Sequence, residues 1–403
     1  MSHPPAKVLT IFGTRPEAIK LAPVIHQLHG DAERFRCVVG VTAQHREMLD
    51  QVLSLFHIAP DFDLDIMRPN QSLFDVTTRA LTRLRPRLEQ IRPDFVLVQG
   101  DTTTAFVSAL AAYYLKIPIG HVEAGLRTHD KYQPFPEEIN RRLISALADL
   151  NFAPTEQARQ NLLQEGIPDA RIFVTGNTVI DALLATAHEG HAFTEPPLRD
   201  MDFQARRVVL VTAHRRENFG QPVANICDAI RQILDAVPDV EAVFSVHPNP
   251  NVRGVVMHML GDRSRVHLIE PLDYAPFVHL MANCALILTD SGGIQEEAPS
   301  LGKPVLVLRN VTERPEGVLA GTLRMVGTHT EKIVQAAVQL LTDDHAYAAM
   351  ARASNPYGDG KASLRIASLL REYFESRPPP AAQHIASGAA VDVAQTKLGG
   401  RRA

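Results

Sequence analysis

The arrangement of apolar runs limits the fold of this chain more than any other feature. Short runs rich in valine, isoleucine and leucine recur along the sequence, and most are followed by a stretch with helical periodicity. Continuous apolar runs, as opposed to alternating apolar and polar residues, are typical of strands buried on both faces of a parallel sheet. We therefore predict an α/β protein in which helices cover both faces of its sheets.

These runs form two series separated by a break. Strands are expected at 7–12, 37–41, 95–99, 117–121, around Phe152, and at 172–175, and then at 207–212, 241–246, 266–269, 285–289 and 304–308. Residues 191–205 interrupt the rhythm with prolines and several charges. The pattern predicts two doubly wound, Rossmann-like domains, residues 1–190 and 206–376, joined by a linker at 191–205, with a ligand site in the cleft between them. Residues 377–403 lack a hydrophobic period and are expected to be disordered.

Composition excludes several functional classes. Lys and Arg number 41 against 45 Asp and Glu, so the chain lacks the basic excess of a general binder of nucleic acid or anionic membranes. The first apolar run is too short for a signal-peptide core or a membrane span. The three cysteines form no CxxC pair, and the 17 histidines show no HxH or HExxH spacing. We expect a cytoplasmic protein without a metal site.

In the first expected domain, polar residues follow three strands. A glycine turn after residues 7–12 leads into Arg15 and Lys20, which could bind an anion or could be solvated basic residues of a tight turn. Asp101 follows the strand at 95–99 and suits either acid–base chemistry or a helix N-cap. Glu123 follows the next strand, and Glu137 opens an acidic pair that could instead be a solvated first helical turn. Several carboxylates near one cleft could divide acid and base roles.

In the second expected domain, two strand ends carry groups suited to a diphosphate. His214 follows the first strand, where it could neutralise or protonate a leaving phosphate or could be a lone surface histidine. A later strand runs into a turn whose backbone N–H groups could form an anion nest, namely Ser291, Gly292 and Gly293. Glu297, one helical turn further, could accept hydrogen bonds from ribose hydroxyls. A simple glycine-rich connector would leave this spacing and the following Arg314 unexplained.

Taken in order, the motifs resemble one known family. They are FGTRPEAIK, TAQHREML, GDTTT, GHVEAGLRT, PEEINRR, TGNTVIDAL, HRREN, TDSGGIQEEAPSLGKPV and TERPEG. Over about residues 6–375 the chain is similar to the non-hydrolysing UDP-N-acetylglucosamine 2-epimerases of bacteria, which form UDP-N-acetylmannosamine. The resemblance implies the glycosyltransferase B fold, a homodimer, and no metal or redox cofactor. It also implies elimination of UDP to 2-acetamidoglucal and re-addition of UDP after protonation of the other face of C2.

The resemblance also assigns roles to residues. It implies acid–base roles for Asp101, Glu123 and Glu137, and it places His214 on the departing diphosphate and Phe277 near uracil. The residues implied to contact UDP are Arg15, Lys20, Ser291, Gly292, Gly293, Glu297 and Arg314. Some family members bind UDP-N-acetylglucosamine at a second, activating site, which Gln44, His45, Arg46, Arg215 and His247 resemble.

Three other readings stay open. A related epimerase could act on a diacetamido-uronic UDP-sugar, and a hydrolysing relative would release UDP and free N-acetylmannosamine. A glycosyltransferase or a catalytically silent UDP-sugar sensor would belong to a different class. The three acidic sites in one domain argue against this last pair, because a sensor needs no acid–base set.

Overall fold

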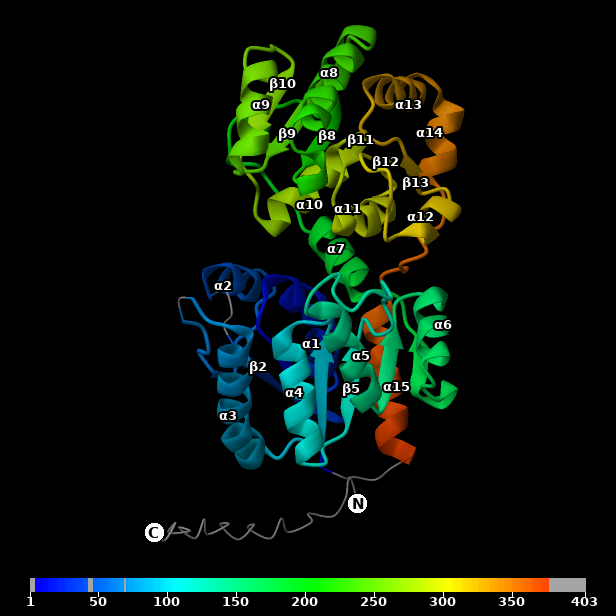
Figure 1. Ribbon diagram of the computed structural model, residues 1–403. Coiled ribbons are helices and arrows are strands. Elements are labelled where there is room, and N and C mark those ends of the chain that lie inside the picture. Colours follow the sequence, from blue (N-terminus) through cyan, green and yellow to red (C-terminus); the bar gives the residue numbers. More distant parts are fainter. Residues whose placement is uncertain (1–3, 43–45, 69, 377–403) are drawn as a thin grey trace, which may run out of the picture.

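The computed structural model describes residues 4–42, 46–68 and 70–376. This part of the chain forms two lobes, each built on a parallel sheet with helices on both faces (Figure 1). The expected fold class, two Rossmann-like α/β domains, is confirmed. The expected disordered tail, residues 377–403, lies outside the described residues.

The sheet of the first lobe has the order β3-β2-β1-β4-β5-β6-β7 among the described residues, and its strands pair in parallel. Residues of β1 are buried on both sides: Val8 and Phe12 join the apolar cluster on one face, whereas Leu9 and Ile11 join the cluster on the other. This double burial explains why the strands are continuous apolar runs. The strands are β1 Ala6–Phe12, β2 Phe35–Val41, β3 Phe62–Asp63, β4 Phe95–Gln99, β5 Ile119–Val122, β6 Leu150–Ala153 and β7 Ile172–Val174.

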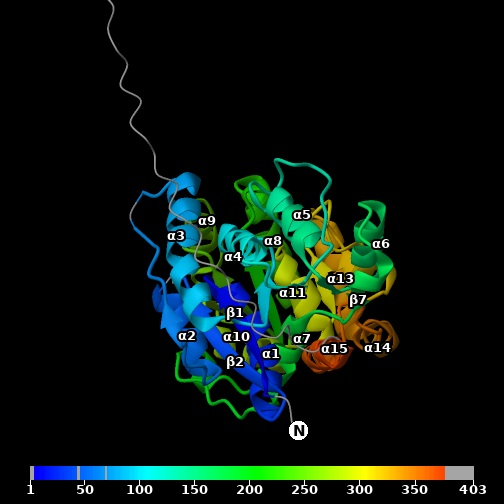
Figure 2. The ribbon, with the colours of Figure 1, turned by 90° about the horizontal axis from the view of Figure 1, so that it is seen from below.

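Helices cover the two faces of this sheet in separate groups. Helices α3, α4 and α5 lie on one face, and α1, α7 and α15 lie towards the other (Figure 2). The first-lobe helices are α1 Arg15–Gly30, α2 Arg46–Leu55, α3 Leu73–Ile91, α4 Thr103–Tyr114, α5 Glu137–Leu147, α6 Glu156–Gln164 and α7 Thr178–His188.

The sheet of the second lobe has the order β10-β9-β8-β11-β12-β13 in the described part of the chain, again with parallel pairing. Its strands are β8 Arg207–Ala213, β9 Val240–Val246, β10 Val266–Ile269, β11 Leu286–Thr289, β12 Val305–Val307 and β13 Leu323–Met325. The helices from here on are α8 Gln221–Ala236, α9 Pro250–Leu260, α10 Tyr274–Asn283, α11 Gly292–Glu297, α12 Pro315–Leu319, α13 Thr330–Thr342, α14 Asp344–Ala351 and α15 Ala362–Ser376.

Both sheets reverse their strand order at one point. The reversal falls between β1 and β4 in the first sheet and between β8 and β11 in the second. At such a switch point the connections after the two strands run in opposite directions and leave a crevice at their carboxyl ends, where ligands of α/β proteins bind. The motifs beginning at Gly13 and Gly100 lie at the first switch point, and those beginning at His214 and Asp290 lie at the second.

The expected second domain, residues 206–376, includes the C-terminal helix α15. Helix α15 returns to the first lobe, where it lies beside α1 (Figure 1). The ring of Phe95 in β4 packs edge-on against Tyr373 at 5.3 Å and Phe374 at 6.1 Å. Asp181 of α7 accepts hydrogen bonds from the backbone N–H groups of Ala362 and Ser363 and so caps α15. The lobe on which α15 packs is therefore determined by these long-range contacts and not by the order of the sequence.

The apolar interior continues from one lobe to the other. One cluster includes Ile19 of α1, Val179 of α7 and Val278 of α10. Rings of the two lobes also meet directly, because Phe56 lies 6.2 Å from Tyr274. The lobes therefore share a packed junction along α7. In the part of the chain that the structure describes, no helix is both long and apolar enough to cross a membrane.

Candidate active site

A buried carboxylate organises the first turn after β1. Glu17 accepts hydrogen bonds through Oε2 from the backbone N–H groups of Gly13, at 2.9 Å, and Thr14, at 2.7 Å. Its Oε1 accepts from the hydroxyl of Thr102 at 2.6 Å, across the switch point. The chain's own carboxylate thus occupies the N–H groups that the sequence suggested for an external anion. Arg15, by contrast, borders an open cavity described below.

Glu123 is the most heavily bonded of the expected acid–base residues. Both its carboxylate oxygens lie 2.6 Å from the ammonium group of Lys20, and the amides of Gln99 and Asn177 also donate to it. Burial alone would raise the pKa of Glu123, but the charge of Lys20 and the hydrogen bonds from Lys20 and Asn177 hold the pKa below its usual value. Lys20 therefore neutralises a carboxylate here and is not directed at the expected diphosphate segment.

The backbone of Glu123 is strained. Its φ is 64°, in the left-handed region, which costs a residue with a side chain about 1–2 kcal/mol. Two residues on, Gly125 has φ 93°, and a Cβ there would come within 2.3 Å of the carbonyl oxygen of Ala158. This turn after β5 is held against α6 and aims Glu123 back towards α1.

Asp101 occupies a different electrostatic environment from Glu123. Its carboxylate lies 2.5 Å from the guanidinium of Arg141 on α5. Burial nevertheless raises the pKa of Asp101, the charge of Arg141 only partly offsets this, and the charge of Glu123 adds to it. The environments of the two carboxylates therefore move their pKa values in opposite directions, which is how a site separates an acid from a base.

A neutral histidine supports the turn before Asp101. Burial lowers the pKa of His121 to about 4, so its ring is uncharged at neutral pH. Its Nε2 lies 2.7 Å from the carbonyl oxygen of Gly100 and must be the donor, because a carbonyl only accepts. Its Nδ1 then accepts from Ser145 of α5, at 3.3 Å. This bridge fixes β4, β5 and α5 relative to one another.

Glu137 is the first residue of α5 and is half-buried. Its neighbour Glu138 is fully buried and accepts hydrogen bonds from the backbone N–H groups of Thr128 and His129. Glu138 therefore fixes the loop before α5, and Arg141 one turn later reaches Asp101. Within this acidic pair, Glu138 is therefore a structural residue, whereas the side chain of Glu137 is partly exposed.

In the second lobe, Asp290 holds His214 in one orientation. The Oδ1 atom of Asp290 lies 2.9 Å from Nδ1 of His214, and the backbone N–H groups of His214 and Arg215 also donate to this carboxylate. Burial would raise the pKa of Asp290, but these hydrogen bonds hold it below its usual value. An ionised Asp290 accepts from Nδ1–H and leaves Nε2 of the imidazole as the atom available to a ligand. The side chain of His214 is 37% exposed.

The start of α11 carries the other expected diphosphate groups. The first N–H groups of a helix have no acceptor within the helix, so those of Gly292 and Gly293 remain available. The guanidinium of Arg314 packs against Gly292, where a Cβ would meet its central carbon at 3.3 Å. Arg314 is bound at 2.8 Å to Glu296, a neighbour of the expected ribose ligand Glu297. Burial and the charge of Glu296 raise the pKa of Glu297 to about 8.

A cavity of about 220 Å³ brings residues of the two lobes together. It is bordered by the expected residues Arg15, His214, His247, Phe277 and Ser291. The structure therefore gathers a cation, an imidazole and an aromatic ring around one space. The rings of His214 and His247 are 5.9 Å apart and nearly parallel.

The remaining residues of the expected activating site can be placed only in part. Gln44 and His45 lie outside the described residues. Arg46 begins α2. Arg215 follows His214, and within the described part of the chain its buried Nε has no hydrogen-bond partner.

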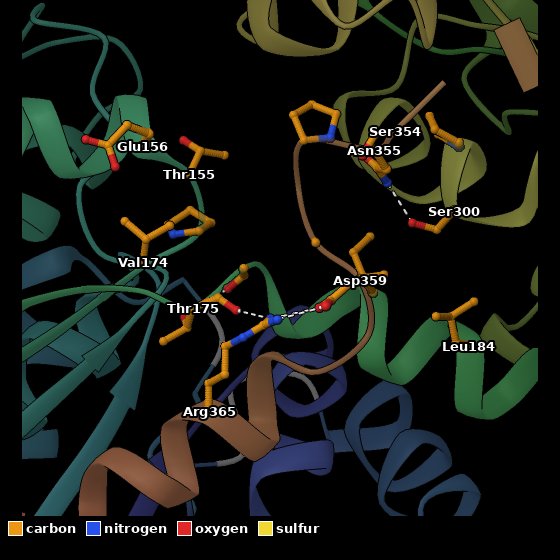
Figure 3. A pocket seen from close by; sticks show the side chains of 16 residues that line it. Thr155, Glu156, Val174, Thr175, Leu184, Ser300, Ser354, Asn355, Asp359 and Arg365 are labelled. Carbon is orange, nitrogen blue, oxygen red and sulfur yellow. Dashed lines mark hydrogen bonds and ion pairs between the residues drawn. The ribbon is translucent and has the colours of Figure 1, made fainter. Parts of the chain in front are cut away.

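A larger cavity, of about 660 Å³, holds none of the expected site residues (Figure 3). It lies where the segment between α14 and α15 crosses between the lobes. On that segment Asn355 donates to Ser300 at 2.6 Å, and Asp359 pairs with Arg365 of α15 at 2.7 Å. Thr155 borders the same space and donates to Glu316 of the second lobe at 3.3 Å.

Sequence reasoning missed four residues that organise the site. Three of them, Glu17, Asp290 and Glu296, lie within the motifs quoted above. The functional roles were assigned to neighbouring residues instead. Asn177 ends the TGN segment before α7 and reads as an ordinary helix cap. A polar residue placed directly after a buried strand was the available signal in one of these cases, Asp290.

Two Rossmann-like lobes, each with polar side chains at the switch point of its parallel sheet, place the chain in the class of two-domain proteins with the glycosyltransferase B architecture. A family model described as UDP-N-acetylglucosamine 2-epimerase matches residues 27–371. The chain therefore belongs to the UDP-N-acetylglucosamine 2-epimerase family.

Individual relatives agree with this assignment. The UDP-N-acetylglucosamine 2-epimerase of Bacillus subtilis is 56% identical over 371 residues, which are 92% of this chain and 96% of the relative. A crystal structure of a putative UDP-N-acetylglucosamine 2-epimerase from Listeria monocytogenes matches with a TM-score of 0.88 and 48% identity, over 93% of this chain and 98% of that one. The Neisseria meningitidis enzyme bound to UDP-GlcNAc matches with a TM-score of 0.80 and 52% identity, over 91% and 100%.

Proposed function

We propose that this protein interconverts UDP-N-acetylglucosamine and UDP-N-acetylmannosamine by eliminating and re-adding UDP. The observation that carries this proposal is the pairing of the two switch points. Asp101 and Glu123, whose pKa values move in opposite directions, occupy one of them. His214 and the N–H groups at the start of α11 occupy the other. The similarity to family members, which extends over at least 96% of their length, supports the same activity.

The proposed elimination removes the proton from C2 of the sugar and breaks the C1–O bond to UDP. The electron pair of the C2–H bond becomes the C1=C2 double bond of 2-acetamidoglucal, and UDP departs with the bonding pair of its oxygen. In the return step, a phosphate oxygen of UDP attacks C1 while a proton is delivered to the opposite face of C2. Because the proton leaves one face and arrives on the other, the reaction needs acid and base groups on both sides of the sugar.

We assign the proton transfers to Asp101, Glu123 and Glu137. Lys20 and Asn177 stabilise the charged form of Glu123, which suits a carboxylate ready to accept a proton. Burial favours the protonated form of Asp101, which suits a group ready to deliver one. These roles exchange in the reverse reaction.

We assign the binding of UDP to the groups around the smaller cavity. Arg15 and His214 would stabilise the charge that develops on the departing diphosphate, together with the N–H groups of Gly292 and Gly293. Phe277 would lie against uracil, and Glu297 would bind the ribose hydroxyls. Lys20 and Arg314 are paired with carboxylates and would act on UDP through the electrostatic field that they set.

The proposal includes three further expectations. The protein works as a homodimer in the cytoplasm, and a second UDP-N-acetylglucosamine binds beside the catalytic site as an activator. The position of His247 next to His214, and the unpartnered Nε of Arg215, support a second sugar nucleotide at this place.

Incubation with UDP-N-acetylglucosamine in deuterated water tests the proposed reaction. NMR spectra should show UDP-N-acetylmannosamine with deuterium at C2, because the abstracted proton exchanges with solvent before a proton returns. Release of free N-acetylmannosamine and UDP would instead indicate the hydrolysing reaction. Product that keeps its original C2 hydrogen would contradict the assignment of exchangeable carboxylates as acid and base.

A further inference from the structure

A single amide connects the carboxylates of the two lobes. Asn177 is 3% exposed and immediately precedes α7. Its Nδ2 donates to Oε1 of Glu123 in the first lobe and to Oε2 of Glu296 in the second, each at 3.0 Å. From this geometry we infer that Asn177 is a positioning residue, which fixes Glu123 for proton transfer and ties it to the diphosphate segment of the second lobe. The inference rests on the proposed function.

The orientation of this amide follows from its partners. Its Oδ1 accepts from the backbone N–H of Val179 at 3.1 Å, and an N–H group can only donate. The NH₂ group must therefore face the two carboxylates, which can only accept, and it offers one hydrogen to each. The backbone N–H of Asn177 donates to the carbonyl oxygen of Tyr357 at 2.7 Å, in the segment that crosses between the lobes. Each polar group named here has a partner.

Asn177 stands in the middle of a chain of opposite charges. Lys20 pairs with Glu123, and Arg314 pairs with Glu296. The neutral amide separates the two carboxylates, which would repel each other at close range. Arg314 also packs against Gly292, the first residue of α11. A displacement of α11 by a bound diphosphate therefore reaches Glu123 through Glu296 and Asn177.

The hydrogen bond from Asn177 also stabilises the charged form of Glu123. Its loss removes one of the interactions that hold the pKa of Glu123 low, and it leaves Lys20 and Gln99 as the remaining side-chain donors that orient the carboxylate. Both changes reduce turnover without removing a group that we assign to UDP. The inference thus predicts a loss in kcat with UDP affinity retained.

The test is a double-mutant cycle of the full-length protein with Asn177→Ser and Glu123→Gln. Serine is a strong N-cap, so α7 keeps its cap while the bridging amide is lost. We expect Asn177→Ser to lower kcat about 10-fold, the scale of one hydrogen bond to a charged group, with UDP affinity by calorimetry within about twofold of wild type. In the Glu123→Gln background the same change should lower kcat by less than about twofold, because a glutamine exchanges no proton and its orientation no longer matters.

Two further variants keep the result interpretable. Asn177→Asp retains the cap and the shape but places a carboxylate between Glu123 and Glu296. It should lose at least as much kcat at neutral pH and recover part of it towards pH 5, where protonation restores an O–H donor. Asn225→Ser removes an amide that donates to the carbonyl of Thr328 and whose partners are not assigned to the site, and it should leave kcat unchanged.

Each outcome decides the inference. If the Asn177→Ser loss is equally large in both backgrounds, or falls on UDP affinity instead of kcat, Asn177 has a general structural role and the inference is overturned. An Asn177→Asp variant without pH recovery also counts against it. If the wild-type protein does not interconvert the two UDP-sugars, the proposed function itself fails, and the inference fails with it.

Discussion

The two switch points are built on different principles. In the first lobe, Glu17 and Glu123 are tightly surrounded by donors from several elements, and Glu123 has a strained backbone. In the second lobe, His214 and Ser291 border an open cavity, and the buried carboxylate Asp290 stands behind His214. The difference indicates a division of labour. Groups that move protons need fixed positions and controlled pKa values, whereas groups that receive a ligand must stay accessible.

The largest effects should follow from removing the proton-transfer groups of the first lobe. We expect Asp101→Asn, Glu123→Gln and Glu137→Gln each to lower kcat by at least ~10²-fold, the usual scale for a positioned acid or base. UDP affinity, measured by calorimetry, should persist because the second lobe is untouched. Glu89→Gln, on the exposed face of α3, is the matched control and should keep wild-type turnover. Near-normal rates in all three site variants would contradict the assignment of proton transfer to the first lobe.

Glycine substitutions test whether the first lobe is the rigid one. Gly125→Ala should lower the free energy of unfolding by at least about 2 kcal/mol, because the new Cβ meets the Ala158 carbonyl at 2.3 Å and φ is 93°. Gly293→Ala should change stability by less than about 0.5 kcal/mol, because its Cβ finds ordinary contact with Glu297. Denaturant titration measures both values. Equal losses of stability in the two variants would contradict the conclusion that the first-lobe turn is the more rigid of the two.

Ligand affinity should depend on the groups around the cavity and not on the carboxylates that exchange protons. We expect Arg15→Ala and Glu297→Ala each to weaken UDP binding by about 1–3 kcal/mol, because each leaves polar groups of the ligand unpaired. Arg85→Ala, on an exposed helix face, is the control. Unchanged UDP affinity in both site variants would mean that the nucleotide binds elsewhere.

The last expected effect concerns the dependence of stability on pH through Glu297 in the second lobe. The pKa of Glu297 is raised to about 8 in the folded protein, so the folded state holds a proton that the unfolded chain releases near pH 4.5. The contribution of Glu297 to the free energy of unfolding therefore falls as the pH rises from about 4.5 to 8. Between pH 5 and 8.5, the free energy of unfolding of the wild type should fall more steeply than that of Glu297→Gln in denaturant titrations. Parallel pH profiles would show that Glu297 is not held protonated.

Much of the fold could be predicted because the chain marks its buried strands clearly. The strand Phe95–Gln99 has the bounds that the sequence predicts, since its continuous apolar run signals double burial. The edge strands Phe62–Asp63 and Leu323–Met325 were missed, because two or three residues carry no periodic signal. The position of α15 was not predictable either, since the pattern of an amphipathic helix does not show on which lobe the helix packs.

The candidate site was predictable as a set of positions but not as a set of contacts. Most of the expected residues lie near the ends of strands, which follows from the topology of parallel sheets. Five of them, Arg15, His214, His247, Phe277 and Ser291, border one cavity. Their pairing depends on residues far apart in sequence. Lys20 and Arg314 each have a carboxylate partner more than 15 residues away, Glu123 and Glu296. The choice between Glu296 and Glu297 as the partner of Arg314 also depends on which side of α11 faces the crossing segment.

The return of α15 to the first lobe has a consequence for the synthesis of this protein. Residues 362–376 leave the ribosome after the whole second lobe, yet they cover the ring of Phe95 in the centre of the first sheet. The first lobe therefore cannot complete its apolar interior while the chain is growing, although domains generally fold in order from the N-terminus. Until translation reaches α15, the nascent protein exposes an apolar surface beside α1, which is the kind of surface that chaperones bind.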